Sequence, residues 1–238
     1  MPLTVEVAVS RLSPFVISLA LLVSAVSGHR VSVRLCTTSS LDSPLNHVAV
    51  IGDSYTAGTT EGGLGTKSWT ARVWQILAEQ GVRVAAGVAS EGRAGYDARG
   101  DHGDVFEDLT ARAVRPDDAL VVFFGSRNDQ DVDPELLAEM ARDTFGVARR
   151  TAASARLLVI GPPWPTADVP NSVLQIRDIL NAQARAAGAA FVDPIGDRWF
   201  LDRPDLIGAD GVHPNDAGHA YLAEKIAPLI GAQFSTRS

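Results

Sequence analysis

The sequence has little cysteine and no excess of positive charge. Cys36 is the single cysteine among 238 residues, so no disulfide can form within the chain. Lys and Arg number 21 against 28 Asp and Glu, a formal net charge of -7. No stretch concentrates basic side chains as a phosphate-binding face would. The composition therefore argues against a nucleic-acid partner, and an acidic surface mainly favours solubility.

Long apolar runs are also scarce, and the one that stands apart lies near the N-terminus. Residues 14–28 read PFVISLALLVSAVSG, and their apolar part is too short to span a bilayer comfortably but suits the core of a signal peptide. The preceding charge pattern is atypical because Glu6 offsets Arg11. We expect residues 1–28 to be a signal peptide or an N-terminal anchor, and the protein to be secreted or held at the cell envelope. A misassigned start codon is the alternative.

The rest of the chain divides by composition. Residues 29–46 are polar and without period, which predicts a linker. The following part predicts one domain over residues 47–232 and a short tail over 233–238. With 46% hydrophobic and 21% charged residues, the chain is typical of a globular protein that needs no disulfide to hold its core.

Five short apolar runs punctuate the domain. Because they do not alternate apolar with polar residues, they predict strands covered on both faces, as in a parallel sheet. The runs span 48–52, 82–89, 119–125, 155–161 and 189–194. Helical patterns separate them: apolar residues recur at helical spacing from Trp69, and Asp133 followed by Pro134 predicts a helix start. Asn171 is expected to cap a further helix, and the last helix is expected to start near Asn215. This alternation predicts one doubly wound α/β domain.

In such a sheet, ligands bind beyond the carboxyl ends of the strands, so the residues that follow each run matter most. These residues include a hydroxyl, flexible glycines, a carboxamide and an Asp/His pair. They are Ser54 after the first run, Gly92 and Gly95 after the second, Asn128 after the third, and Asp210 and His213 before the last helix. A nucleophile, a base, an orienting acid and oxyanion donors are what acyl transfer requires.

Four blocks of sequence carry these residues. They are Gly-Asp-Ser at 52–54, a glycine after the second run, Gly-x-x-Asn-Asp at 125–129 and Asp-x-x-His-Pro at 210–214. In order and rough spacing they resemble the four blocks of the SGNH, or GDSL, hydrolase family, over residues 48 to about 231. The resemblance implies a three-layer α/β/α fold with a flavodoxin-like parallel five-stranded sheet of order 2-1-3-4-5, which would place Ser54 beside Asn128.

The resemblance also implies roles. Ser54 would be the nucleophile, with its own N–H as one oxyanion donor, and Asn128 would donate a side-chain N–H to the oxyanion. His213 would be the general base, confined to an extended backbone by the following proline. Asp210 would accept the Nδ1–H bond and orient the imidazole. Of the other histidines, His102 is the one serious rival.

The sequence does not decide which backbone amide after the second apolar run supplies the remaining oxyanion donor. The family has a glycine after the second strand, and Gly92 aligns best, but the sequence GVASEGRAGYD departs from the family pattern there. The amides of Arg93 and Gly95 remain alternatives. Asp53 is expected to support the Ser54 loop through backbone bonds, and Asp129 to do the same for the loop of Asn128.

Together these residues predict a secreted serine esterase that forms an acyl-enzyme on Ser54 and needs neither a metal nor an organic cofactor. The short chain, without an obvious lid insertion, favours short-chain or carbohydrate O-acyl esters. The alternatives are a lipase, thioesterase or lysophospholipase acting on lipid esters, and a non-catalytic glycan-binding protein on the same fold. Trp164, Trp199 and Phe200 are candidates to line the pocket, although such aromatics are as often core. We expect a monomer whose partner is a small-molecule, glycan or lipid ester, with possible association with the cell envelope.

Overall fold

The computed structural model describes residues 44–235 of the chain. The expected leader at 1–28 and nearly all of the expected linker lie outside the described residues. The first strand begins at Leu45 and the last helix runs to Ser235, so regular structure extends slightly past both expected limits of the domain, residues 47 and 232.

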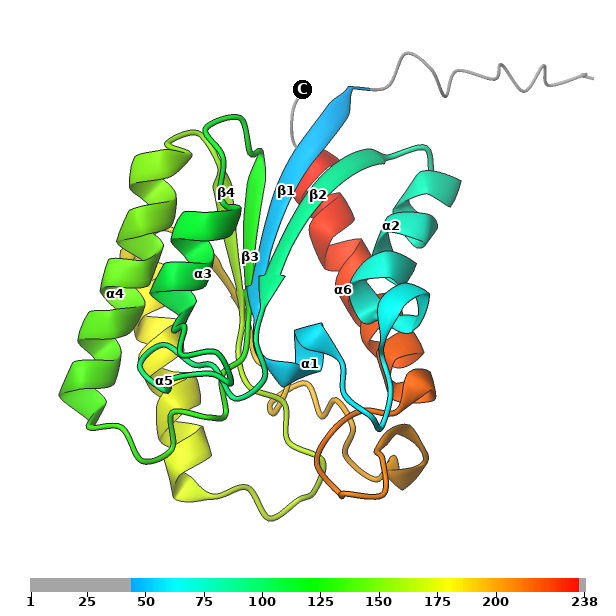
Figure 1. Ribbon diagram of the computed structural model, residues 1–238, viewed down its shortest axis with the longest axis vertical. Coiled ribbons are helices and arrows are strands. Elements are labelled where there is room, and N and C mark those ends of the chain that lie inside the picture. The colour runs from blue at the N-terminus through cyan, green and yellow to red at the C-terminus, as the bar shows by residue number, and fades with distance from the viewer. Residues whose placement is uncertain (1–43, 236–238) are drawn as a thin grey trace, which may run out of the picture. The chain divides into compact units, whose positions relative to one another are not determined.

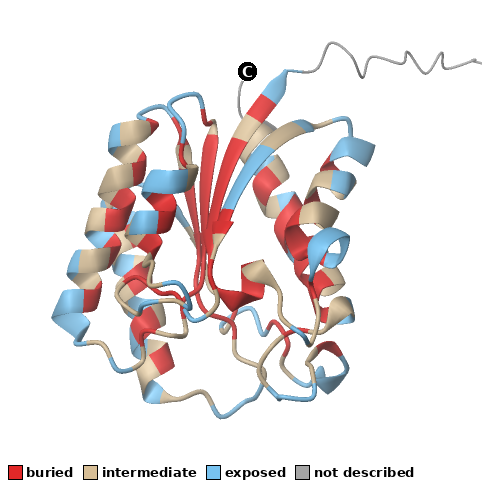
Figure 2. Cartoon of the chain, in the orientation of Figure 1, coloured by how far each residue is buried: buried red, intermediate tan, exposed pale blue. Residues whose placement is uncertain are grey.

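Five parallel strands form one sheet in the order β2-β1-β3-β4-β5, which confirms the expected topology. The strands are β1 (Leu45–Gly52), β2 (Arg83–Ser90), β3 (Leu120–Phe124), β4 (Arg156–Ile160) and β5 (Ala190–Val192). Central β3 is buried along its whole length, whereas the edge strand β2 has several exposed positions (Figure 2). The continuous apolar runs are therefore explained by layers of helix on both faces.

Two groups of helices cover the sheet (Figure 1). One face carries α2 (Trp69–Glu79) and α6 (Asp216–Ser235), and the other carries α3 (Phe106–Ala113), α4 (Pro134–Thr151) and α5 (Asn171–Ala186). Successive strand residues point to opposite faces, so β1 contributes Val48 and Val50 to the core beneath α2 and α6, and Ala49 and Ile51 to the core beneath α3, α4 and α5.

The helix boundaries follow local capping chemistry. Asp133 caps α4 with a side-chain oxygen that accepts the backbone N–H of Glu135 at 2.9 Å, and Pro134 occupies the first turn as expected. The fifth helix differs slightly from expectation, because Pro170 holds the cap position and Asn171 is already helical. Among the described residues, no helix combines the length and the apolar character that a membrane span requires.

Strand register brings the functional segments to one edge of the sheet. Gly52, the last residue of β1, pairs with Ser90 of β2 and with Phe124 of β3. The chain therefore leaves all three strands at the same level. The short helix α1 (Ser54–Ala57), the loop after β2 and the loop after β3 all begin from this edge.

Candidate active site

Ser54 opens α1 immediately after β1, and its side chain is nearly buried at 9% exposure. Asp53 caps the helix by accepting the N–H of Tyr55 at 2.9 Å, which is the supporting role expected for it. The preceding Gly52 leaves no room for a Cβ, which would collide with the side chain of Thr56. Together the glycine, the cap and the tight turn present the serine hydroxyl at the carboxyl edge of the sheet.

Burial decides the charge of Asp53. Removal from water raises the pKa of its carboxyl to about 7, against the lowering effects of the Tyr55 N–H bond and of the positive charge of Arg127. Arg127 is therefore the cation that most stabilises the ionised form of this buried acid.

His213 reaches Ser54 from the other end of the domain. Its Nε2 lies 3.0 Å from the Ser54 Oγ, and its Nδ1 lies 2.6 Å from Oδ2 of Asp210. The second oxygen of Asp210 accepts the backbone N–H groups of Val212 and His213, both at 2.9 Å. The three expected residues thus meet in the order hydroxyl, imidazole, carboxylate.

Hydrogen bonding keeps Asp210 ionised. Partial burial acts to raise its pKa, but the bonds from the His213 ring and from the backbone N–H groups of His213 and Val212 outweigh it and lower the pKa to about 2. An ionised carboxylate on Nδ1 holds that proton in place and leaves Nε2 free to accept one from Ser54.

Asn128 lies in the loop after β3. Its side-chain Nδ2 donates one N–H to the carbonyl of Ala94 at 2.9 Å, and its backbone N–H donates to Ser126 Oγ at 3.0 Å. A carboxamide nitrogen carries two N–H groups. One therefore fixes the side chain against the loop after β2, and the second has no hydrogen-bond partner within the described part of the chain.

The loop after β2 distinguishes between the amides left open above. The N–H of Gly95 donates to the carbonyl of Ala98 at 2.8 Å and is therefore already used. Among the hydrogen bonds between residues 44 and 235, the amides of Gly92 and Arg93 donate none. Arg93 takes a left-handed backbone with φ of 66°. Of the three amides left open, those at positions 92 and 93 are therefore free to donate, and that of Gly95 is not.

Asp129 supports a different loop from the one expected. Its carboxylate accepts the backbone N–H groups of Tyr96, Asp97 and Ala98 at 2.9 to 3.0 Å. Burial raises its pKa, while these bonds act in the opposite direction. Asp129 therefore ties the loop after β3 to the loop after β2, rather than bracing the Asn128 loop alone.

Glu91 is a supporting residue that the sequence reasoning missed. It is 4% exposed, and its carboxylate accepts the backbone N–H groups of His102 and Gly103. His102, the rival base, has a side chain that is 87% exposed and lies 3.6 Å from Glu91. Ser54 has its hydrogen bond with His213 instead. The signal available in the sequence was an acidic residue, Glu91, just after the second apolar run. A carboxylate buried at that place needs hydrogen-bond partners.

Of the three candidate pocket aromatics, two are buried in the core and one is partly exposed. Trp199 and Phe200 are 3% and 1% exposed and belong to the core beneath α6. Trp164 is half-buried in the loop after β4, where the guanidinium of Arg127 lies 4.4 Å from the centre of its ring. Phe200 is therefore a packing residue, and Trp164 is the aromatic that lies next to the Asn128 loop.

Two cavities are lined in part by the loop after β4. One of about 380 Å³ lies between the loop after β4, the 3₁₀ helix η2 (Pro204–Leu206) and Gly211 of the His213 loop. The other, of about 230 Å³, is lined by apolar side chains that include Trp164 and Trp199. Both share Thr166 and Ala167.

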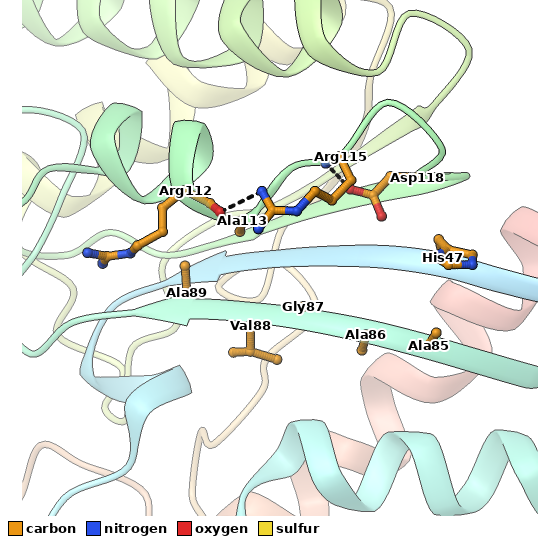
Figure 3. Close-up of a pocket in the computed structure, with 10 residues that line it drawn as sticks. All are labelled: His47, Ala85, Ala86, Gly87, Val88, Ala89, Arg112, Ala113, Arg115 and Asp118. Atoms are coloured by element: carbon orange, nitrogen blue, oxygen red, sulfur yellow. Dashed lines mark hydrogen bonds between the residues drawn. The ribbon is translucent and has the colours of Figure 1, made fainter.

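A third cavity, of about 390 Å³, lies elsewhere, along β2 and the end of α3. Figure 3 shows its lining, from His47 on β1 to Arg112 on α3, and it includes none of Ser54, Asp210 and His213. Within the described part of the chain, no cluster of three metal-ligand side chains occurs.

Comparison with known proteins shows the family of the chain. The sequence model of a family described as "GDSL-like Lipase/Acylhydrolase family" matches residues 50–221. A curated protein, "GDSL lipase Rv0518" from Mycobacterium tuberculosis (strain ATCC 25618 / H37Rv), is 69% identical over 228 residues, which cover 94% of this chain and 99% of that protein.

Solved structures share the fold. The crystal structure of TesA superposes with a TM-score of 0.63 at 23% identity, covering 79% of this chain and 100% of that one. A family two carbohydrate esterase from Clostridium thermocellum, solved with cellohexaose, gives a TM-score of 0.63 at 16% identity, covering 80% of this chain and 65% of that one. At these identities the likeness concerns the fold.

Proposed function

Because the chain belongs to the GDSL-like lipase/acylhydrolase family of ester hydrolases, we propose that it is a serine esterase that forms an acyl-enzyme on Ser54. The observation that carries the proposal is the pair of contacts of His213, 3.0 Å to the Ser54 Oγ and 2.6 Å to Asp210. Both distances suit hydrogen bonds, so a proton can pass from the hydroxyl to the imidazole without a change of fold.

In the first half of the reaction, the Ser54 Oγ attacks the ester carbonyl while His213 Nε2 takes its proton. A C–O bond forms and the carbonyl oxygen becomes an oxyanion. The imidazolium then gives its proton to the leaving alcohol, and the C–O bond to that alcohol breaks. Ionised Asp210 stabilises the imidazolium while it lasts.

In the second half, water replaces the alcohol. His213 takes a proton from the water, whose oxygen attacks the acyl carbon, and the acid leaves as the proton returns to Ser54 Oγ. No step draws on a metal or an organic cofactor.

Three donors would stabilise the oxyanion: the N–H of Ser54, the second side-chain N–H of Asn128 and an amide after β2. The free amide of Gly92 supports its assignment over Gly95, whose N–H is bonded to Ala98. Fixed donors of this kind typically contribute a factor of about 10²–10³ each.

For the substrate we propose short-chain or carbohydrate O-acyl esters. The cavity of about 380 Å³ beside Gly211 supports a bulky group near the His213 loop. A second candidate is a lipid ester, which the name of the 69% identical relative and the apolar cavity beside Trp164 both favour. A secreted enzyme would meet either class at the cell envelope, and the apolar run at 14–28 supports export.

The catalytic proposal is tested by labelling the purified protein with a fluorophosphonate probe and by measuring turnover of an aryl acetate. Ser54→Ala should abolish both signals, while Ser172→Ala, a control on α5 whose hydroxyl donates to Gln130, should leave both unchanged. An undiminished rate in Ser54→Ala contradicts the acyl-enzyme. Binding of a glycan without any labelling of the wild-type protein would favour the non-catalytic alternative.

The substrate class is tested with p-nitrophenyl esters of increasing chain length, run beside acetylated polysaccharides and a lysophospholipid. We expect kcat/KM to be highest for short acyl groups, or for an acetylated glycan. A rate that rises steadily with chain length, or that is highest on the lysophospholipid, would replace this proposal with the lipid candidate.

A further inference from the structure

Tyr55 follows the nucleophile and is buried with 1% exposure. Its ring packs edge-on against Phe124 of β3 and Phe200, with centroids 6.2 and 6.4 Å away. Its hydroxyl donates a hydrogen bond of 2.5 Å to the carbonyl of Val212, which is the residue before His213. A phenol buried for packing alone could be a phenylalanine, so the hydroxyl needs its own explanation.

The segment that receives this bond is already stiff. Asp210 Oδ1 accepts the N–H groups of Val212 and His213, and Gly208 donates its N–H to the carbonyl of His213. These hydrogen bonds tie residues 210–213 together as one piece. The Tyr55 hydroxyl bonds this piece to α1. Tyr55 is the residue after the nucleophile Ser54, and its acceptor Val212 is the residue before the base His213.

Arg127 adds a third segment. Its positive charge acts on the Tyr55 hydroxyl and acts to lower the pKa of that group, and its guanidinium lies 4.4 Å from the centre of the Trp164 ring. Arg127 directly precedes Asn128 in the loop after β3. The tyrosine oxygen therefore bonds to the segment of the base, its own residue adjoins the nucleophile, and the charge of Arg127 acts on it from the loop of the proposed oxyanion donor.

We propose that Tyr55 is a positioning residue whose hydroxyl, bonded to the carbonyl of Val212, sets the relative placement of Ser54 and His213. The inference rests on the esterase function proposed above and names how its site is held together. Arg127 contributes through its positive charge near Tyr55, and its guanidinium lies 4.4 Å from the centre of the Trp164 ring.

The chemistry of the hydroxyl suits this role. Burial holds the pKa of Tyr55 above its ordinary value, although Arg127 acts to lower it, so the O–H remains protonated and able to donate at neutral pH. A misplacement on the order of 1 Å in such a site costs about 10²-fold in rate.

The first test is Tyr55→Phe, which removes one oxygen and keeps the ring. We expect kcat to fall by about 10- to 100-fold, with KM changed by less than about two-fold, because ester binding does not use the hydroxyl. Rates are expressed per active site, with sites counted by fluorophosphonate labelling taken to completion. Tyr221→Phe is the matched control, because this tyrosine packs on the other side of Phe200, and its kcat should not change.

A purely structural hydroxyl would give a different result. Tyr55→Phe would then lower the melting temperature and leave kcat per labelled site at the wild-type value, and that outcome overturns the proposal. The failure is distinguishable from failure of the esterase function, because Ser54→Ala would still abolish turnover. A loss confined to KM would equally contradict a positioning role.

The second test asks whether Arg127 acts through Tyr55. Arg127→Met should reduce kcat in the wild-type background and have little further effect in Tyr55→Phe, because the hydroxyl on which its charge acts is already absent. Arg127→Lys, which keeps the charge, should recover part of the loss. If the two single losses multiply in the double variant, Arg127 acts independently and that part of the proposal is wrong.

Discussion

At the scale of single residues, Asp210 has two tasks because its two oxygens have different partners. Oδ2 faces the ring of His213, while Oδ1 accepts two backbone N–H groups of the same loop. The first contact concerns the charge and tautomer of the base, and the second concerns the shape of the loop. A substitution that keeps the shape and removes the charge separates the two tasks.

Asp210→Asn is that substitution. The side-chain carbonyl oxygen of the asparagine can still accept the backbone N–H groups of Val212 and His213, but the negative charge next to the His213 ring is lost. We expect kcat on an aryl acetate to fall by less than about 10⁴-fold, the cost seen in a comparable triad. Circular dichroism should show an unchanged fold. A kcat equal to that of the wild type would mean that Asp210 only closes the turn.

Asn128 concerns the transition state. We expect Asn128→Ala to lower kcat by about 10²–10³-fold and to change KM little, because the donor is used only when the oxyanion has formed. Asn171→Ala at the start of α5 provides an exposed control. Should Asn128→Ala raise KM instead and leave kcat intact, the side chain would bind the ground state and the oxyanion assignment would be wrong.

At the scale of elements, the loop after β2 depends on how tightly its neighbours are held. A Cβ at Gly95 would collide with the carboxylate of Asp129, which three backbone N–H groups hold in place. A Cβ at Gly92 would meet only the end of the Asp101 side chain, which is 45% exposed and can turn away. The two glycines are thus unequal, although both lie in one short loop.

Gly95→Ala should therefore cost about 1–3 kcal/mol of unfolding free energy, in the range of overpacking, and Gly92→Ala less than about 1 kcal/mol. Chemical denaturation of both variants at the same pH measures the difference. Equal destabilisation would show that Asp129 can move, and the tie between the two loops would then be weaker than its hydrogen bonds indicate.

At the scale of the whole molecule, two buried groups make stability depend on pH in opposite directions. Burial lowers the pKa of His219 on α6 from 6.5 to about 4, and burial raises that of Asp53 from 3.8 to about 7. Between pH 6.5 and 4 the unfolded chain protonates His219 and the native chain does not, so the native state loses stability as pH falls. Asp53 acts oppositely, because the native state binds its proton first.

His219→Asn removes the titrating imidazole and so isolates its effect on stability. The asparagine keeps an acceptor for the backbone N–H of Trp69, which donates to Nδ1 of His219 at 3.3 Å. The wild type should lose on the order of 3 kcal/mol more than the variant between pH 6.5 and 4. Urea unfolding across that pH range gives the two slopes. If the unfolding free energies of the two proteins change in parallel with pH, the pKa of His219 is the same in the folded and unfolded states, and this prediction is wrong.

Much of the fold was determined by the sequence alone, because the signals are local. Continuous apolar runs predicted strands buried on both faces, and the Asp133–Pro134 pair predicted the start of α4. The four motif blocks, by their resemblance to a known family, also gave the strand order and the candidates Ser54, Asn128, Asp210 and His213. These features depend on residues close in the chain or on a recognisable pattern.

Tertiary structure decided what depends on contacts between distant segments. The Tyr55 hydroxyl and its acceptor Val212 are 157 residues apart, and no period or local motif marks such a pair. The same holds for Asp129, whose carboxylate bonds to the backbone of the loop after β2, more than thirty residues earlier in the chain. Local propensity sets which elements form, whereas only their packing brings a particular donor within reach of a particular acceptor.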